Sequence, residues 1–214
     1  MDAYKQLFNN KEINMILNSI NEIHCNAAFT FPACHGRYHA LFVVDAVEHV
    51  LTLLSYDLRT IELGKIAALL HDIGNIAGRW NHAQKSAALA QVFLGGTDYL
   101  LPEEKCTIIQ AIEDHSNGTV INSAVGAALL IADKADHSKK RILPSGAIDD
   151  WHKNLLGIEN VDISISDNAI TFDYITTDAF SKDAYFSDYR SHGVLTRAAA
   201  YFNRIFQMQF NESE

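Results

Sequence analysis

Hydrophobic residues recur at helical spacing through most of the first 136 residues of the chain. A stripe at i, i+4, i+7, i+11 and i+14 predicts a helix from Arg37 to Tyr56, with His39 at the start of its buried face. The same periodicity predicts helices over residues 4–24, 60–72, 82–94, 102–115 and 120–136, and residues 27–36 are expected to form a loop. The pattern therefore predicts a mostly α-helical bundle.

Strict alternation of apolar and polar residues replaces the helical period after Pro144. Residues 161–175 alternate on both sides of Asp167-Asn168, which suits a two-residue turn, so this segment predicts a β-hairpin. A final helix is expected within residues 184–209, with an apolar face made of Leu195, Ala198, Ala199, Phe202, Ile205 and Phe206. We expect residues 158–210 to cap the bundle or to form a homodimer contact, within a single domain that spans residues 1–214.

Composition limits the classes of partner that the chain can have. Its formal net charge of -9 argues against a general nucleic-acid surface, although a bound metal could still attract a small anion. The three cysteines form no C-x-x-C pair, which suits reduced cytosolic thiols. No signal peptide is evident, and no segment approaches the roughly 20 apolar residues of a membrane span. A cytoplasmic protein with no membrane partner is expected.

One apolar run, Leu69-Leu70-His71-Asp72-Ile73-Gly74-Asn75, carries an adjacent histidine and aspartate. A carboxylate in the protein interior is costly unless it is paired or bound to a metal, and imidazole and carboxylate are both good ligands for divalent first-row metals. The alternative is a helix C-terminus, with His71 near the last carbonyls and Gly74 as the cap. The choice between these two interpretations depends on whether the chain offers further candidate ligands.

Four further polar residues lie at or near the ends of apolar helical stripes, and they are His39, His82, His115 and Asp133. A side chain at such a position can point inward without disrupting the packing of the stripe. Each of the four, taken alone, is more often a satisfied core residue or a surface residue. Together with His71 and Asp72 they supply four imidazoles and two carboxylates, and ligation of metal explains all six at once.

The order of these residues resembles the two-metal pattern H…HD…H…H…D of the HD-domain metal-dependent phosphohydrolases. The resemblance covers residues 37–136 and implies a compact helical bundle. It also implies two divalent ions that share Asp72 as a bridge. One ion would be held by His39, His71, Asp72 and Asp133, and the other by Asp72, His82 and His115.

The same resemblance implies hydrolysis of a phosphate ester, either of a nucleotide or of a small phosphorylated metabolite. A hydroxide generated by the two ions would attack phosphorus, with Asp72, His82 and His115 at the catalytic centre. The donor set suits iron or manganese, and zinc, cobalt or nickel could also bind. The expected partner is therefore a small anionic phosphorylated substrate.

Two subgroups of the family match less well, and two other functions remain open. The extension of the HD-GYP phosphodiesterases is absent, and Ile73-Gly74-Asn75-Ile76 replaces the acids of the H-D-x-x-E-D motif of guanosine-tetraphosphate hydrolases. A di-iron oxygenase that cleaves C–C or C–P bonds would use a similar ligand pattern. A non-catalytic metal- or nucleotide-binding regulatory module is the third possibility.

Several charged residues and histidines lie outside the pattern. The candidates for binding substrate phosphate are Lys134, Arg79, Lys85 and Arg141, although a solvated surface charge is the commoner role of each alone. His24 and His35 lie near the pattern in sequence but outside its positions. His49 is expected on a solvated face beside Glu48. The remaining histidines, His137, His152 and His192, are expected at the surface.

Overall fold

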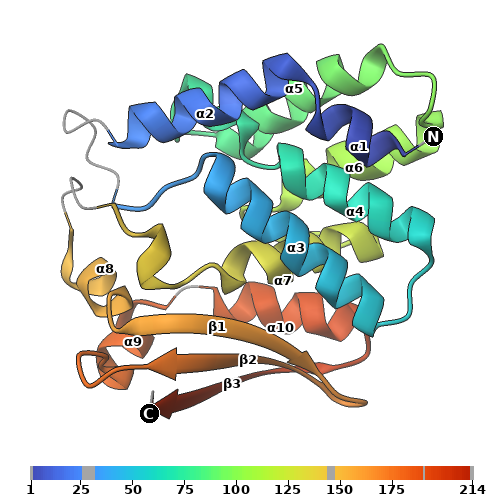
Figure 1. The fold of residues 1–214 in the computed structure, drawn as a ribbon. Helices are drawn as coiled ribbons and strands as arrows, with labels where there is room; N and C mark the ends of the chain where they lie inside the picture. The colour runs from blue at the N-terminus through green and yellow to red at the C-terminus, as the bar shows by residue number, and fades with distance from the viewer. Residues whose placement is uncertain (1, 26–31, 144–147, 190, 213–214) are drawn as a thin grey trace.

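The computed structural model describes residues 2–25, 32–143, 148–189 and 191–212. Its helical part consists of α1 (Ala3–Phe8), α2 (Lys11–Cys25), α3 (Arg37–Leu53), α4 (Leu58–Leu70), the 3-10 turn η1 (Ile73–Ala77), α5 (His82–Gly95), α6 (Pro102–Asp114) and α7 (Ala124–Ala135). The C-terminal part consists of η2 (Lys139–Arg141), α8 (Asp150–Leu155), β1 (Ile158–Ile165), β2 (Ala169–Thr176), α9 (Lys182–Asp188), α10 (His192–Tyr201) and β3 (Ile205–Glu212) (Figure 1). The mostly helical fold class predicted from the sequence is confirmed.

Helix α7 forms the centre of the helical part and packs against α3, α4, α6 and α10. All of its residues except Lys134 are buried, as expected for a helix that is apolar on every side. Ser123 fixes its start, because the Ser123 hydroxyl accepts a hydrogen bond from the Gly126 N–H at 3.1 Å. Since the helix is enclosed along its length, its last turn carries Asp133 into the interior.

The single helix predicted over residues 4–24 is wrong, because the chain breaks at Asn9-Asn10. The Asn10 side chain accepts hydrogen bonds from the backbone N–H groups of Glu12 and Ile13, at 2.9 and 3.1 Å. Asparagine competes for backbone donors in this way and so starts a new helix where the apolar period alone predicts a continuous one.

The predicted hairpin is confirmed, and its strands belong to a three-stranded sheet in the order β1-β2-β3. Strands β1 and β2 are antiparallel, and the Ser166 N–H donates to the Ala169 carbonyl at 2.9 Å across the turn at Asp167-Asn168. Strand β3 runs parallel to β2 and follows α10 in the chain. A strand therefore occupies part of the segment where a helix was predicted.

The final helix predicted within residues 184–209 is present as α10, but the last two residues of its predicted apolar face do not belong to it. Helix α10 stops before Asn203, whose φ of 57° is a left-handed conformation that ends helices. Ile205 and Phe206 consequently lie on β3, where Phe206 packs edge-on against Phe172 of β2 at a ring distance of 5.0 Å. The apolar residues of α10 itself are buried as predicted, and they include Leu195, Ala198 and Ala199.

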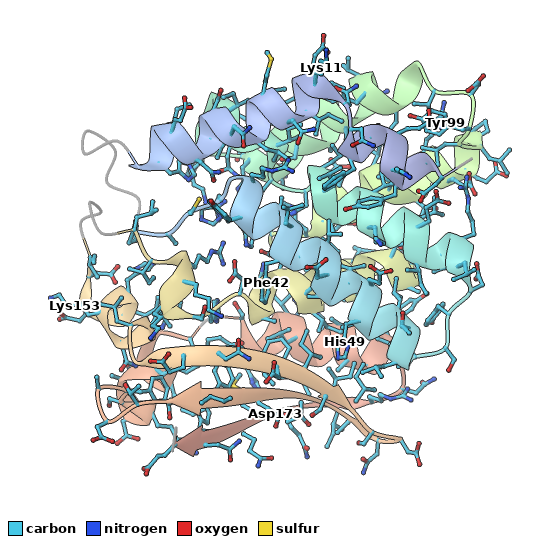
Figure 2. The ribbon with its side chains drawn as sticks, in the orientation of Figure 1. Lys11, Phe42, His49, Tyr99, Lys153 and Asp173 are labelled. Carbon is cyan, nitrogen blue, oxygen red and sulfur yellow. The ribbon has the colours of Figure 1, made fainter. Side chains whose placement is uncertain are left out.

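The sheet lies along one side of the helical part, with α10 packed against both α7 and β3 (Figure 1). Figure 2 shows Phe42 and His49 on α3, on the side of that helix toward the sheet. His49 is exposed, as expected for a residue on a solvated face. Its Nε2 atom also lies 2.9 Å from the carbonyl of Ile163 on β1. In the described part of the chain, no helix has the length and hydropathy needed to cross a membrane.

Candidate metal centre

Five helix ends meet at one buried point, and each brings at least one of the six residues predicted as metal ligands. In chain order these ends contribute His39, His71 with Asp72, His82, His115 and Asp133. His71 and His115 are the C-cap residues of α4 and α6, so their side chains turn inward where the helical backbone stops. All six side chains are buried except His82, which is half-buried. The structure therefore brings together every residue of the predicted ligand set.

Gly74 explains how the loop after Asp72 can approach the start of α5. A Cβ atom at Gly74 would lie 2.4 Å from the backbone nitrogen of Ser86 and 2.6 Å from the carbonyl oxygen of His82. The Gly74 N–H also donates to the Ser86 hydroxyl at 2.8 Å. Close packing of η1 on α5 thus places His82 beside Asp72. Gly74 is not the helix cap of the alternative interpretation of the sequence, because His71 is the C-cap residue of α4.

The first group of donor atoms faces the Oδ2 atom of Asp72. The Nε2 atoms of His39 and His71 each lie 3.6 Å from this oxygen and 3.2 Å from each other. Asp133 Oδ1 lies 3.1 Å from His39 Nε2 and 3.8 Å from His71 Nε2. We call His39, His71, Asp72 and Asp133 the first lobe.

The second group faces the other carboxylate oxygen of Asp72, Oδ1. His82 Nε2 lies 3.5 Å and His115 Nε2 lies 3.6 Å from this atom, and the two nitrogens are 3.2 Å apart. Among the described residues, buried Asp72 Oδ1 has no hydrogen-bond partner. We call Asp72, His82 and His115 the second lobe, so Asp72 alone belongs to both.

The hydrogen bonds of the Nδ1 atoms determine whether the Nε2 atoms, which face the centre of the cluster, have a lone pair to offer a metal. Backbone carbonyls accept from the Nδ1 atoms of His71 and His115, at 2.7 and 2.6 Å. A neutral imidazole carries one N–H, so an Nδ1–H leaves a lone pair on Nε2. In the second lobe the Nδ1 atom of His82 lies 3.2 Å from the Arg79 carbonyl, which places two Nε2 lone pairs face to face. Converging lone pairs and a buried carboxylate oxygen without a hydrogen bond fit a divalent cation.

Burial keeps two of these imidazoles neutral, as ligation requires. It lowers the pKa of His71 to about 3 and that of His82 to about 4. Burial alone would raise the pKa of Asp72, but the neighbouring histidines outweigh it and hold that pKa well below its usual value. His39 differs, because hydrogen bonds to Asp133 and Asp136 raise its pKa despite burial and nearby Arg141. An ionised Asp72 carboxylate and the neutral imidazoles of His71 and His82 are therefore present near pH 7.

The donor atoms also lie close enough together for several of them to bind one metal ion. Among the described residues, three groups of three offer ligand atoms that all lie within 4.8 Å of one another. Two of these groups are drawn from the predicted ligands, namely His39 with His71 and Asp133, and His71 with Asp72 and His115. The cluster is therefore one that can hold a divalent metal ion.

Three of the four cations predicted to bind substrate lie at a pocket of about 320 Å³ that opens beside Asp133, and they are Arg79, Lys134 and Arg141. Arg79 Nη1 lies 3.5 Å from Asp72 Oδ1, and the Lys134 ammonium pairs with Asp133. Lys85 lies elsewhere, because its ammonium donates to the carbonyls of Ala77 and Gly78 at 2.8 and 3.2 Å. The structure thus separates Lys85 from the other three.

Three buried residues of the site were not among the predicted ligands. His35 Nδ1 lies 2.9 Å from Asp72 Oδ2 and 2.9 Å from Arg141 Nη2, which places His35 beside the first lobe. Asp136 contacts His39, and its position one helical turn after Asp133 was a signal in the sequence. The third, His137, was expected at the surface but is buried.

The other histidines outside the pattern differ in their surroundings. His24 is buried, and its Nδ1 atom accepts a hydrogen bond from the backbone N–H of His35 at 3.3 Å. His137 lines the same pocket as Arg79, and its Nδ1 atom lies 3.1 Å from the Tyr185 hydroxyl. His152 is half-buried, and His192 is exposed as predicted.

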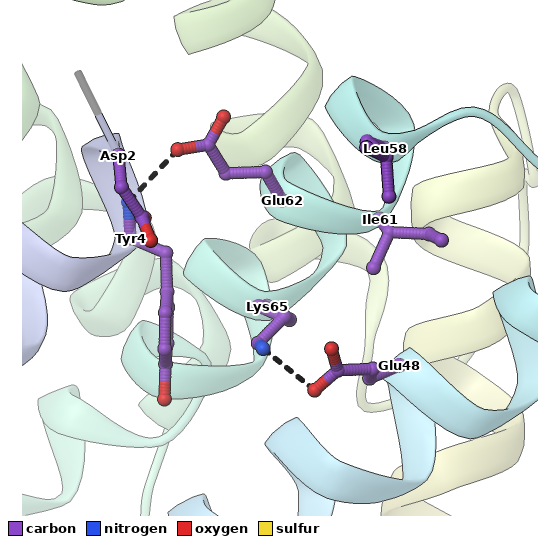
Figure 3. Close-up of a pocket in the computed structure, with 7 residues that line it drawn as sticks. All are labelled: Asp2, Tyr4, Glu48, Leu58, Ile61, Glu62 and Lys65. Atoms are coloured by element: carbon purple, nitrogen blue, oxygen red, sulfur yellow. Dashed lines mark hydrogen bonds and ion pairs between the residues drawn. The ribbon is translucent and has the colours of Figure 1, made fainter.

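A separate pocket of about 270 Å³ lies between α1, α3 and α4 (Figure 3). It adjoins Glu48 near the end of α3 and Glu62 near the start of α4, whereas the histidine cluster lies at the opposite ends of these two helices. Lys65 Nζ donates to Glu48 at 2.6 Å, and Glu62 accepts from the backbone N–H of Tyr4 at 3.2 Å (Figure 3). Its polar groups therefore hold α1 and α3 on α4, and no histidine is among its described lining residues.

The fold and the cluster define a mostly helical protein with a buried histidine–aspartate centre that can hold a divalent cation. Among solved structures, the chain is similar to the crystal structure of a predicted HD superfamily hydrolase from an uncultured Thermotogales bacterium. The two sequences are 23% identical, the match covers 60% of this chain and 68% of that chain, and the TM-score is 0.46. The search of family models and the search of curated proteins each gave no match.

Proposed function

We propose that this protein is a metal-dependent hydrolase of phosphate esters with two divalent ions bound side by side. The observation that carries the proposal is the position of Asp72, whose two carboxylate oxygens face two separate groups of imidazole nitrogens. A bridging carboxylate between two sets of ligands is the arrangement that a two-metal hydrolase requires. The first lobe would hold one ion and the second lobe the other.

Two ions so placed would supply a hydroxide near neutral pH and would neutralise charge on the phosphoryl oxygens. In the hydrolysis, a water oxygen forms a bond to phosphorus while the ester P–O bond breaks, and the alcohol leaves with a proton. No side-chain nucleophile is needed. Imidazole and carboxylate donors favour iron or manganese as the native metal, and zinc, cobalt or nickel would also fit.

The chain's own cations would bind the substrate. Arg79 contacts Asp72, Arg141 contacts His39, and Lys134 adjoins the first lobe through Asp133. These three positive charges surround one pocket of a protein whose net charge is -9. A local cationic pocket in an acidic protein favours a small anion over a nucleic-acid backbone. A nucleotide or another small phosphorylated metabolite is the substrate class that we propose.

The test is hydrolysis after reconstitution with metal. Freshly purified protein would be analysed for metal and then assayed, with that metal restored, on p-nitrophenyl phosphate, bis-p-nitrophenyl phosphate and nucleoside monophosphates. We expect phosphate release that chelation abolishes and added metal restores. Asp72→Ala should be inactive, whereas His192→Ala, a control at an exposed histidine, should match the wild type.

Two results would contradict the proposal. One is a protein with bound metal that releases no phosphate or alcohol from any of these esters. The other is iron-dependent oxygen consumption with the same organic phosphates or phosphonates, which would identify an oxygenase instead. Parallel measurement of oxygen and phosphate separates the two chemistries in one experiment.

A further inference from the structure

The four ligand imidazoles are not oriented in the same way. The Nδ1 atoms of His71, His82 and His115 each face the backbone carbonyl three residues earlier in the chain. His39 lies in the first turn of α3, which begins at Arg37, so no earlier turn of that helix offers it a carbonyl. Its Nδ1 atom instead faces a side chain from another element.

That side chain is Asp136, the C-cap residue of α7. Its Oδ2 atom lies 2.6 Å from His39 Nδ1, and its carboxylate is buried. Arg141 supports the contact, because Arg141 Nη1 donates to the Asp136 carbonyl at 3.1 Å while its Nε atom lies 3.8 Å from Asp136 Oδ2.

We propose that Asp136 is the positioning residue that fixes His39 as an Nε2 donor and thereby sets the affinity of the first lobe for its ion. The inference rests on the metal centre of the proposed function and not on hydrolysis itself. Asp136 is not one of the six predicted ligands, and it would act on the ion through His39 rather than by binding the ion itself.

The physical reason is a competition between two tautomers of His39. Its Nε2 atom lies 3.1 Å from Asp133 Oδ1, which would accept a hydrogen bond from an Nε2–H group. Without Asp136, a buried Nδ1–H would lose its acceptor, and the Nε2–H tautomer that donates to Asp133 would be favoured. That tautomer has no Nε2 lone pair for a metal and also occupies the Asp133 oxygen. Asp136 therefore keeps two ligand atoms of the first lobe available.

The test is titration of the metal-free full-length protein with Mn²⁺, followed by electron paramagnetic resonance of the free ion. The variants are Asp136→Ala, which removes the acceptor, and Asp136→Asn, which keeps an acceptor oxygen without its charge. Tyr185→Phe is the matched control, because it removes the hydroxyl beside His137, a buried histidine that is not a ligand. Circular dichroism verifies that each variant is folded.

We expect Asp136→Ala to weaken one of two Mn²⁺ sites by about 10–100-fold, the usual effect of losing an outer partner of a ligand histidine. Asp136→Asn should weaken the same site less, and Tyr185→Phe should weaken neither. Equal weakening of both sites, or Asp136→Ala affinities equal to those of the wild type, would overturn the proposal. If the wild type itself binds no Mn²⁺, Fe²⁺ or Zn²⁺, the proposed function fails as well, and the two failures are thereby distinguished.

Discussion

The two lobes of the cluster are built from the same ligand types but differ in enclosure and support. In the first lobe the side chains of His39 and His71 are fully buried, and Asp136 adds a third carboxylate behind His39. In the second lobe 14% of the His82 side chain is exposed, and the Nδ1 atoms of His82 and His115 face backbone carbonyls. A buried site with charged support holds its ligands more rigidly than a half-open one with neutral support. We therefore expect a tight first ion and an exchangeable second ion.

Removal of the second ion should have the largest effect on activity. His82→Ala should retain about one ion, because the ligands of the first lobe remain. Hydrolysis should fall by about a thousandfold, since loss of one of two Lewis acids forfeits several kcal/mol of transition-state stabilisation. Elemental analysis and steady-state kinetics on one preparation measure both quantities. A His82→Ala protein with normal turnover would show that the second lobe takes no part in catalysis.

Partial chelation should separate the lobes without mutation. A weak chelator at increasing concentration should remove one ion first and abolish hydrolysis while the other ion stays bound. Exposure of His82 gives the second ion the easier exit. Metal content and activity, followed together, should therefore decline with different chelator midpoints. Simultaneous loss of both ions would contradict the difference in rigidity between the lobes.

Gly74→Ala should weaken the second lobe selectively. The added Cβ would press on the Ser86 nitrogen and the His82 carbonyl, so the start of α5 must move away from Asp72. We expect roughly tenfold weaker binding of one ion, the low end of the effect of disturbing a ligand's support. Gly95→Ala is the control, because no atom lies near the Cβ that it would add. Stronger loss from the first lobe would show that η1 positions Asp72 rather than His82.

Acid should destabilise the metal-free protein through histidines that folding keeps neutral. Burial lowers the pKa of His137 to about 3, so between pH 6.5 and 3 the unfolded chain binds its proton more readily than the folded one. The contribution of each such histidine to the free energy of unfolding is thus fully present above pH 6.5. It is lost as the pH falls, by at most about 1.4 kcal/mol per pH unit for each histidine. Urea unfolding at pH 7.5 and 5.5 should show a smaller loss for His137→Gln than for the wild type. Equal losses would mean that His137 charges without cost in the folded protein.

The smallest effect is expected at the rim of the pocket. Lys134→Ala should raise the KM for a phosphorylated substrate about threefold to tenfold and leave the metal content intact, because the lysine is partly neutralised by Asp133. Lys85→Ala should leave KM unchanged, since that ammonium is bound to two loop carbonyls. A constant KM for the Lys134 variant across a panel of substrates would make Lys134 a structural partner of Asp133 only.

The helical period in the sequence predicted the helix ends that matter for the site. One apolar stripe began at His39 and two others ended at His115 and Asp133, and the structure brings these residues together because each helix end reaches the same buried point. Helix positions are local properties of a sequence, so periodicity captures them well.

Non-local contacts account for what the sequence did not show. Phe206 followed the helical period of α10, but parallel pairing with β2, distant in sequence, made it part of a strand. His35 and His137 carry no periodic signal of burial. Residues of η2 and α8 line the pocket beside them, and Tyr185 of α9 contacts His137. Asp136 was the detectable omission, since it stands one turn after a predicted ligand.

Metal content of three matched preparations tests the bridging role of Asp72 most directly. Wild type, His82→Ala and Asp72→Ala would be loaded with the same metal, desalted and analysed for protein and metal together. We expect about two ions, about one ion and almost none, because Asp72 faces both lobes whereas His82 faces only the second. Two ions bound to folded Asp72→Ala protein would remove Asp72 from the bridge and contradict the two-lobed centre.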